Sequence, residues 1–413
     1  MTTTAIDALF DPDIVQDPHE YYRILRETDP VHEVEGTGTY LVTRMDLIQD
    51  VVNQPDVFSS TTAEYLHKGD WPRPGLRPAA TGVSIEDAGG AIATADPPDH
   101  TRQRKVVART LSTSNMQAME PEFRELVTSA LSSVGEDGRI DWMAQVAEPL
   151  PMIMVARILG LPDSLAPVLK TQGYAMVERI GGFVPEDGIQ DLENEGINSL
   201  GPVIEAYLHA KDDPSICSDG LIGVVANAVG SEELSELEAL GILSVIIAAG
   251  GESTTSLTGT AVRILAERPE LQQRLRQDLA LIPTFVEESL RYDPPFRGHY
   301  RVVTRDTELA GKQLPAGSHL VLVWPAANRD PAAFERPDEI SLERPRPRQH
   351  VGFGWGIHLC LGAPLARIEA KVAIETLLTS SRHCRIDAHA SPLRYHPSLL
   401  VRRLTALPLV LEW

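Results

Sequence analysis

The 413-residue sequence is poor in cysteine and has a deficit of positive charge. Its three cysteines, Cys217, Cys360 and Cys384, are too few for a disulfide scaffold, and their scarcity indicates a reducing compartment. Lysine and arginine number 37 against 58 aspartate and glutamate residues, so the formal net charge is −21. Nucleic acids and anionic membranes need a basic protein surface, and the charge therefore argues against both as partners.

The sequence also lacks a long hydrophobic run and an N-terminal targeting signal. The longest apolar run, around residues 242–249, falls far short of the about 20 residues that span a bilayer. The N-terminal segment has neither the basic nor the apolar part of a secretory signal. We therefore expect a cytoplasmic, monomeric protein without membrane contact.

Apolar residues recur mainly at helical spacing, and many of the 31 prolines stand where such a pattern stops. Helices are predicted over 116–134, 143–160, 233–267, 270–292 and 363–379. Strand signals are few and short, at 40–42, 320–323 and 399–401. Residues 59–94, rich in glycine, proline and threonine, predict one long loop. Because no linker divides the chain, the sequence predicts a mainly α fold in a single domain over 1–413.

The predicted helix over 233–267 has an unusual centre. A capping box from Ser235 to Glu238 precedes the apolar pattern, and Pro269 ends it. The middle reads AAGGESTTS where a buried helix would be aliphatic, and a glycine pair costs about 1–2 kcal/mol there. The segment is either a solvent-facing kink or a distorted turn beside a cavity, with polar groups aimed at a ligand.

The stretch HVGFGWGIHLCLGAPLARIEA indicates a thiolate site. Alone, Cys360 would more often be an inert core residue. Here Phe353, Gly356, Cys360 and Gly362 form the arrangement F-x-x-G-x-x-x-C-x-G, and glycines let backbone N–H groups approach a thiolate. A helix beginning directly after the cysteine favours negative charge. No second cysteine or histidine stands at zinc spacing, so the lone axial thiolate points to heme iron.

The cysteine loop, the polar centre of the long helix and two further motifs described below occur in the same order as in the bacterial cytochromes P-450 of the actinobacterial type. The chain thus resembles these proteins, which are heme-thiolate monooxygenases. The resemblance covers essentially the whole chain. It implies the cytochrome P-450 fold, with a long central helix, a helical bulk and minor β-sheets, and it implies heme b (iron protoporphyrin IX) as the cofactor. Cys360 would be the axial iron ligand and Phe353 would shield its sulfur. Gly356 and Gly250 would belong to the cofactor-binding segments.

The same resemblance assigns partners to the heme propionates. His100 and Arg104 lie one turn apart in ADPPDHTRQRK, where the family uses two such groups for propionates. Arg301, in GHYRVVTRD, matches a strand arginine with the same role, and His358 of the cysteine loop would reach a propionate as well. Without the resemblance, HTRQRK is only a basic helix face.

Glu288 and Arg291 form an E-x-x-R motif, in which a carboxylate and a guanidinium one turn apart can pair bidentately. On its own this motif is a weak signal, since many helices carry such a solvated pair. The resemblance gives the pair a structural role behind the heme, together with a third arginine. Arg344 and Arg346 are both candidates for that third member.

The polar centre of the long helix resembles the oxygen-activating segment of the family. Splitting dioxygen consumes two protons, and an acid–alcohol pair can relay them through water. The pair in this chain is Glu252 and Ser253. The family usually places threonine directly after the acid, whereas Ser253 lacks the methyl group that fixes the rotamer. Thr254 is therefore a second candidate for the relay.

The resemblance implies hydroxylation or epoxidation of a small apolar or aromatic molecule of secondary-metabolite type. No flavin or dinucleotide fingerprint is fused to the chain, so the electrons would come from a separate ferredoxin and ferredoxin reductase. Basic residues that could dock an acidic ferredoxin are Arg102, Arg104, Lys105, Arg109, Arg344, Arg346 and Arg348. Arg297 and His299, in PPFRGHY, stand near the expected pocket wall. The sequence is equally compatible with a polar contact to the substrate and with a role at the surface or at the heme edge.

Two other functions are considered. The first keeps the heme chemistry but ends in oxidative radical coupling, with C–C or C–N bond formation or dimerisation of aromatic natural products such as tryptophan-containing cyclic dipeptides. The second, from another class, is a heme-binding protein that recruits an enzyme without turning over. The mass of the product distinguishes radical coupling from hydroxylation, because hydroxylation adds one oxygen and coupling removes two hydrogens or gives a dimer. Consumption of reducing equivalents would exclude the recruitment protein.

Overall fold

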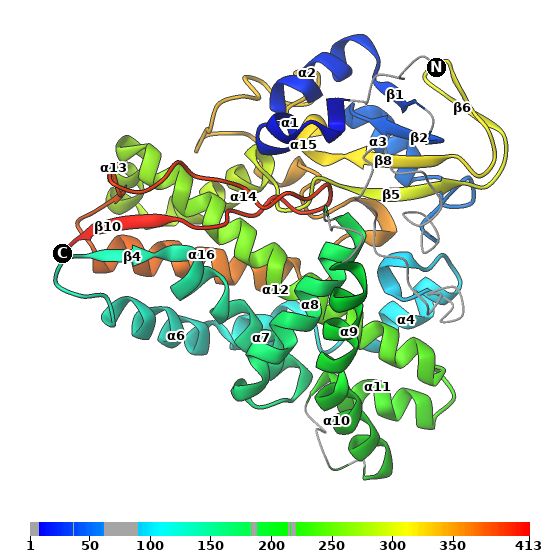
Figure 1. The fold of residues 1–413 in the computed structure, drawn as a ribbon, viewed down its shortest axis with the longest axis horizontal. Helices are drawn as coiled ribbons and strands as arrows, with labels where there is room; N and C mark the ends of the chain where they lie inside the picture. Colours follow the sequence, from blue (N-terminus) through cyan, green and yellow to red (C-terminus); the bar gives the residue numbers. More distant parts are fainter. Residues whose placement is uncertain are drawn as a thin grey trace.

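The computed structural model describes residues 8–35, 37–61, 90–181, 183, 188–213, 215 and 220–413. A sheet region with the N-terminal helices lies at the top of Figure 1, and a larger helical body lies below it. The predicted mainly α fold is confirmed. Cys217 and residues 62–89, the greater part of the predicted long loop, lie outside the described residues.

The helices of the described residues are α1 (Pro12–Gln16), α2 (His19–Thr28), α3 (Met45–Val52), α4 (Asp99–Ala108), α5 (Thr113–Ala118), α6 (Glu120–Ser132), α7 (Pro149–Leu159), α8 (Ala166–Gly181), α9 (Ile189–Ser199), α10 (Gly201–Asp212), α11 (Leu221–Gly230), α12 (Glu236–Glu267), α13 (Pro269–Gln277), α14 (Ile282–Tyr292), α15 (Trp324–Ala327) and α16 (Ala363–Ser380). The strands are β1 (Val31–Val34), β2 (Thr39–Val42), β3 (Phe58–Ser59), β4 (Arg139–Asp141), β5 (Gly298–Val303), β6 (Thr307–Leu309), β7 (Lys312–Leu314), β8 (His319–Val323), β9 (His383–Ile386) and β10 (Pro408–Glu412).

The largest sheet has the order β1-β2-β8-β5-β3, and two smaller sheets have the orders β4-β10-β9 and β6-β7. The predicted strands at 40–42 and 320–323 are confirmed as β2 and β8, which pair in parallel with Tyr40 opposite Leu320. The predicted strand over 399–401 is wrong. Within the described chain this segment makes one isolated bridge, from Val401 to Phe296. The Leu399 N–H donates to the Gly181 carbonyl of α8, and the N–H groups of Leu400 and Val401 donate to the Ser398 hydroxyl, so no ladder continues.

The predicted helices at 233–267 and 363–379 are confirmed as α12 and α16, but three others are wrong in their bounds. The helix predicted over 270–292 is divided into α13 and α14. Asp278 ends α13 and its side chain accepts the Ala280 N–H at 3.0 Å, which caps a new turn before Pro283 opens α14. Likewise, 116–134 holds the end of α5 and then α6, and 143–160 begins as a π-helical turn before α7.

Helix α12 crosses the helical body and positions the polar segment predicted to be functional. Its capping box is confirmed, because Ser235 Oγ accepts the Glu238 N–H at 3.2 Å and Glu238 Oε2 accepts the Ser235 N–H at 2.8 Å. The glycine-rich centre stays regular helix without a break. A Cβ at Gly250 would lie 2.7 Å from Val155 Cγ2 of α7, so this glycine permits close packing of the two helices.

By length and composition α12 is the helix of the described residues that is long and apolar enough to cross a membrane. Its C-terminal half is nevertheless almost entirely buried inside the protein, where it packs on α7, α8, α14 and α16. Burial by neighbouring helices is what the core helix of a folded domain shows, and it accounts for the apolar composition.

Candidate active site

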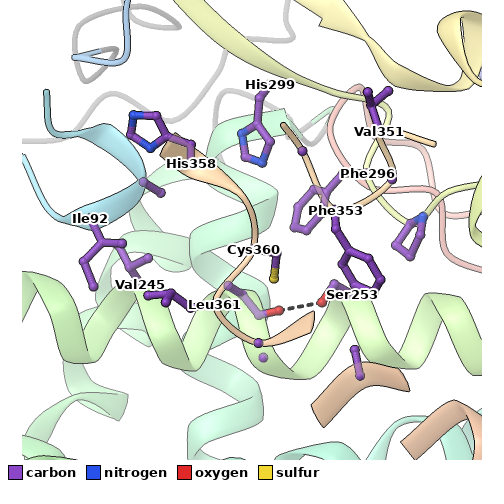
Figure 2. Close-up of a pocket in the computed structure, with 18 of the residues that line it drawn as sticks. Ile92, Val245, Ser253, Phe296, His299, Val351, Phe353, His358, Cys360 and Leu361 are labelled. Atoms are coloured by element: carbon purple, nitrogen blue, oxygen red, sulfur yellow. Dashed lines mark hydrogen bonds between the residues drawn. The ribbon is translucent and has the colours of Figure 1, made fainter. Parts of the chain in front are cut away.

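A cavity lies where α12, β5 and the cysteine loop (residues 350–362) meet, as Figure 2 shows. The space between its lining atoms is about 1620 Å³, a figure that includes solvent at the open mouth. Val245, Phe296 and Leu361 belong to its largely apolar wall. The cavity therefore combines an apolar wall with an open mouth, as the sites of small molecules and cofactors do.

Cys360 lies in the wall of this cavity, on the loop that precedes α16. The side chain is deep in the protein, and the surface that it exposes faces the cavity. Burial raises the pKa of the thiol, while the N–H groups of Gly362 and Ala363 and the charge of Arg104 act in the opposite direction. Backbone donors and a helix N-terminus stabilise a sulfur that carries negative charge, which is the form that binds a metal.

The cysteine loop is shaped by glycines in the left-handed region. Gly354 and Gly356 have φ angles of +74° and +69°, which other residues adopt only with strain. Gly362 is different, because its φ is −79° and a Cβ there would lie at an ordinary 3.8 Å from Cys360 Sγ. The loop itself therefore requires glycine at position 356, but not at position 362.

Phe353 anchors the loop to the helices beneath it. Its carbonyl accepts the Cys360 N–H at 2.9 Å, and the Arg367 guanidinium of α16 lies 4.5 Å from the centre of its ring. Arg367 Nε donates to Glu287 Oε1 at 2.6 Å, and His350 Nε2 lies 3.0 Å from the other oxygen of that carboxylate. These contacts tie the cysteine loop to α14 and α16.

The four residues predicted to bind propionates lie together. Arg104, Arg301 and His358 line the cavity, whereas His100 lies behind His358, with 4.1 Å between the ring centroids. The His358 Nε2 and Ser60 Oγ atoms are 2.9 Å apart. The structure thus brings all four predicted residues to one edge of the cavity, three of them in its wall.

Among the residues that the structure describes, this cluster has no matching set of carboxylates. Burial, together with the charge of Arg301 and other neighbours, lowers the pKa of His358 to about 2, and burial lowers that of Arg301 to about 10. Burial and the charge of Arg104 lower the pKa of His100, whose two ring nitrogens are buried without a hydrogen-bond partner among the described residues. The charge of Asp96 partly offsets the lowering for His100 and Arg301. Such a cluster fits a cofactor that carries two carboxylates.

Ser253 and Thr254 both line the cavity from α12, next to Gly250. Ser253 Oγ donates to the carbonyl oxygen of Ala249 at 2.6 Å, the bond that is dashed in Figure 2. The Thr254 side chain is buried, and the backbone carbonyl oxygen of Thr254 accepts from Thr258 Oγ1 at 3.0 Å. Either hydroxyl is therefore placed to act on a molecule in the cavity.

Glu252 is directed away from the cavity wall. Its Oε1 accepts from Arg403 Nε at 2.9 Å, and Arg403 also reaches Glu148 Oε1 at 3.3 Å. The Oε2 atom is buried without a hydrogen-bond partner among the described residues. Burial raises the pKa of Glu252, and the charge of Arg403 opposes that rise. The structure thus separates the two members of the predicted acid–alcohol pair.

Arg297 and His299 have different surroundings. Arg297 is buried and donates through Nη2 to the Val15 carbonyl at 2.5 Å, so it joins this segment to α1. His299 faces the cavity between Phe296 and Trp324, with ring centroids 5.4 and 4.7 Å away. Burial lowers the pKa of His299 to about 4, so its imidazole is neutral at neutral pH.

The E-x-x-R pair is buried beneath the cysteine loop, and Arg344 is its third member. Arg291 Nε and Arg344 Nε both donate to Glu288 Oε1 at 2.7 Å. The other carboxylate oxygen, Oε2, accepts the Ser341 N–H at 2.9 Å. Arg346 is exposed and has a left-handed backbone, which takes it out of the network.

Sequence reasoning overlooked Trp324, Arg403 and Glu369. Trp324 lines the cavity from α15, and Arg403 belongs to a C-terminal segment without a motif. Neither residue stands at a sequence spacing that indicates a functional site. Glu369 did give a signal, because it is a single carboxylate on the apolar face of LARIEAKVAIETLL, and it proves to be buried.

Comparison with known proteins gives one family. Residues 195–403 match the family model described as Cytochrome P-450. The whole chain is 39% identical to Cytochrome P-450 144 of Mycobacterium tuberculosis over 93% of that protein. It is 31% identical to the cyclomarin C epoxidase CymV of Salinispora arenicola, over 92% of each chain. The chain belongs to the cytochrome P-450 family of monooxygenases, whose cofactor is heme b with a cysteine thiolate as axial ligand.

Solved structures agree with this assignment. The Bacillus megaterium cytochrome CYP109E1 in complex with testosterone is 28% identical, covers 97% of this chain and 99% of its own, and has a TM-score of 0.81. CalO2 is 26% identical, covers 99% of each chain and has a TM-score of 0.87. The cytochrome P-450 fold expected from the sequence is therefore confirmed.

Proposed function

We propose that this chain is a heme-thiolate enzyme that activates dioxygen with electrons from a ferredoxin and hydroxylates or epoxidises a small apolar molecule. The observation that carries the proposal is the Cys360 thiol in the wall of an apolar cavity, at whose edge the donors have no matching set of carboxylates within the described part of the chain. In this proposal the Cys360 sulfur would bind the heme iron, and Arg104, Arg301, His358 and His100 would hold the propionates. The bound heme supplies dioxygen binding and cleavage, to which a thiolate ligand contributes electron density.

The residues around the cofactor site orient and protect it. In this proposal Phe353 shields the sulfur, and the N–H groups of Gly362 and Ala363 support negative charge on it. The apolar wall excludes water from the reacting centre. Gly250 and Ser253 both line the cavity from α12, and the Ser253 hydroxyl holds a proton close to it.

The cavity favours an apolar, uncharged substrate. Ile92, Val245 and Phe296 offer apolar contacts, and the neutral imidazole of His299 offers one hydrogen-bond donor and one acceptor. One relative is named as an epoxidase of cyclomarin C, and one solved relative holds testosterone. We therefore propose an apolar or aromatic substrate of the natural-product type.

The proposed function is tested with the heme-loaded protein, a surrogate ferredoxin and its reductase. A library of apolar natural products is first screened for a shift of the Soret band, and binders are then incubated with reducing equivalents and dioxygen. A product that gains one oxygen atom supports the proposal. A product that loses two hydrogens, or a dimer, indicates oxidative coupling instead, and no consumption of reducing equivalents indicates a recruitment protein.

We also propose that residues 1–413 form one catalytic domain that is monomeric and cytoplasmic and contacts neither membrane nor nucleic acid. The net charge of −21 and the burial of α12 support this. Light scattering and fractionation of expressing cells test it: a dimer, or recovery with the membranes, would contradict it.

The proposed ferredoxin contact is smaller than the basic face predicted from the sequence. Arg102 binds the Glu238 carboxylate, Arg104 turns to the cavity edge, and Arg344 is buried with Glu288. The exposed members that are left, here called the basic surface, are Lys105, Arg109, Arg346 and Arg348.

Charge reversal on the basic surface is expected to slow electron transfer. Lys105→Glu and Arg109→Glu would each reduce the first-electron rate from an acidic ferredoxin about tenfold at low salt, since steering depends on complementary charge. Stopped-flow measurements of heme reduction over a range of salt concentrations check this. Arg385→Glu, on β9, is the matched control, and a rate that depends on neither salt nor the two substitutions would refute the docking proposal.

Replacing Ser253 by alanine is expected to raise the fraction of reducing equivalents lost as hydrogen peroxide severalfold, because a hydroxyl in the groove beside α12 is removed. The measurement is peroxide formed per reducing equivalent consumed. Ser253→Thr restores the hydroxyl and should lower the loss again. Unchanged coupling in Ser253→Ala would take this residue out of oxygen activation.

A further inference from the structure

The Asp96 carboxylate, just before α4, holds the residues at the end of β3. Its Oδ1 atom accepts the Ser60 N–H at 2.8 Å, and its Oδ2 atom accepts from the Ser59 hydroxyl. The Ser59 hydroxyl in turn accepts the Thr61 N–H at 3.0 Å. Asp96 thus joins two segments of the chain that are 36 residues apart, and it holds Ser60 and its neighbours in place.

The strand β3 has other contacts that keep it in its sheet. It pairs with β5 in antiparallel register, and the Thr304 N–H beyond β5 donates to the Val57 carbonyl at 2.9 Å. The bond from Asp96 to the Ser60 N–H therefore acts beyond the strand, on the first residue after it. What that residue contacts decides what the Asp96 carboxylate does.

The Ser60 hydroxyl contacts His358. Ser60 is 1% exposed, and its Oγ atom lies 2.9 Å from His358 Nε2. His358 lines the cavity from the cysteine loop (Figure 2). A hydroxyl can both donate and accept, so it can bind the imidazole whichever ring nitrogen carries the proton. A chain of contacts thus runs from Asp96 through Ser60 to a residue of the predicted propionate cluster.

His358 lies beside another member of the propionate cluster. Its ring centroid is 4.1 Å from that of His100, and the charge of Asp96 acts on both His100 and Arg301. A side chain on a loop loses rotational freedom when it binds a ligand, and that loss weakens binding. A contact that fixes the ring beforehand reduces the loss. The Ser60 contact is therefore suited to strengthen the hold of His358 on a bound carboxylate.

We propose that Asp96 and Ser60 position His358 for a heme propionate. Asp96 fixes the backbone of Ser60, and the Ser60 hydroxyl fixes the orientation of the His358 ring. Both are positioning residues, because they act on the cofactor through His358. The inference rests on the propionate assignment within the proposed function, and it extends that assignment to two residues outside the predicted cluster.

Resonance Raman spectra of the resting heme-loaded protein test the inference without turnover, because the bending bands of the propionates report hydrogen bonds to their oxygens. Ser60→Ala should shift such a band in the same direction as His358→Ala but by less, since the imidazole is loosened and not removed. In the His358→Ala background, Ser60→Ala should cause no further shift. An unchanged spectrum in Ser60→Ala, or an equal shift in both backgrounds, would overturn the inference.

Transfer of heme to apomyoglobin gives a second readout. Ser60→Ala and Asp96→Ala should each raise the rate constant of heme loss severalfold. Ser381, at the end of α16, provides the matched control, because it is buried outside the cavity wall and its hydroxyl donates to the Leu377 carbonyl at 2.7 Å. Ser381→Ala should lose heme at the wild-type rate. Wild-type rates in both Ser60→Ala and Asp96→Ala would contradict the inference.

These measurements separate the inference from the proposed function. If His358→Ala leaves the propionate bands unchanged, the propionate assignment itself is wrong. If His358→Ala shifts them and Ser60→Ala does not, only the inference is wrong. A wild-type protein that consumes no reducing equivalents would refute the proposed oxidation, while the Raman bands would still report on the propionates. Should Asp96→Ala not fold, Ser60→Ala decides, because it removes a single oxygen atom and leaves the Asp96 carboxylate in place.

Discussion

Replacing Cys360 by serine is expected to reduce oxygen-dependent turnover to the background rate. The thiol is in the cavity wall, and the N–H groups of Gly362 and Ala363 support negative charge on its sulfur. A serine oxygen is a poorer electron donor to iron than a thiolate, so oxygen cleavage loses its main driving contribution. Consumption of reducing equivalents and product formation, both normalised to bound heme, are the measurements.

Cys384 provides the matched control for this substitution. It is a free cysteine on β9, buried, and burial raises its pKa to about 12, which marks an inert thiol. Cys384→Ser should therefore keep the wild-type turnover per heme. Equal activity in Cys360→Ser and Cys384→Ser would show that the cavity thiol has no part in the reaction.

Replacing Glu288 by glutamine is expected to destabilise the protein by about 3–5 kcal/mol, because buried guanidinium groups lose their counterion. Arg291 and Arg344 share this carboxylate at 2.7 Å, and both are buried. Burial raises the pKa of Glu288, but the hydrogen bonds and charges of these two arginines lower it below its ordinary value. Denaturant unfolding and the heme content of the purified protein check the prediction.

The surface pair of Arg274 and Glu343 gives a matched control for the buried network. Both side chains are about half exposed, and surface ion pairs contribute at most about 1 kcal/mol. Glu343→Gln should therefore leave the free energy of unfolding nearly unchanged. If Glu288→Gln costs no more than Glu343→Gln, the buried network does not hold the core behind the cysteine loop.

The proximity of candidate site residues could be predicted from the sequence where their spacing is local. Cys360 and Phe353 belong to one loop, and one helical turn brings Glu288 to Arg291, so both motifs follow from backbone geometry alone. A long helix that has a capping box at its start and a proline at its end, such as α12, was also predictable. The predicted bounds of a helix were wrong where a single side chain caps a new turn inside an apolar pattern, as Asp278 does between α13 and α14.

Contacts between distant segments could not be predicted. Glu252 looked like the partner of Ser253 because they are neighbours in the chain, but successive residues of a helix point in different directions and Arg403 draws the acid away. The choice between Arg344 and Arg346 depended on the path of an irregular loop. The unpaired state of Glu369 likewise depends on which side chains surround it.

The most direct test of the account is the Soret band of the reduced, carbon monoxide-bound protein. The account predicts the strongly red-shifted band that a thiolate opposite carbon monoxide produces, and it predicts that Cys360→Ser loses this band while Cys384→Ser retains it. A wild-type protein with the short-wavelength band typical of histidine-ligated heme would contradict the central claim that Cys360 is the iron ligand.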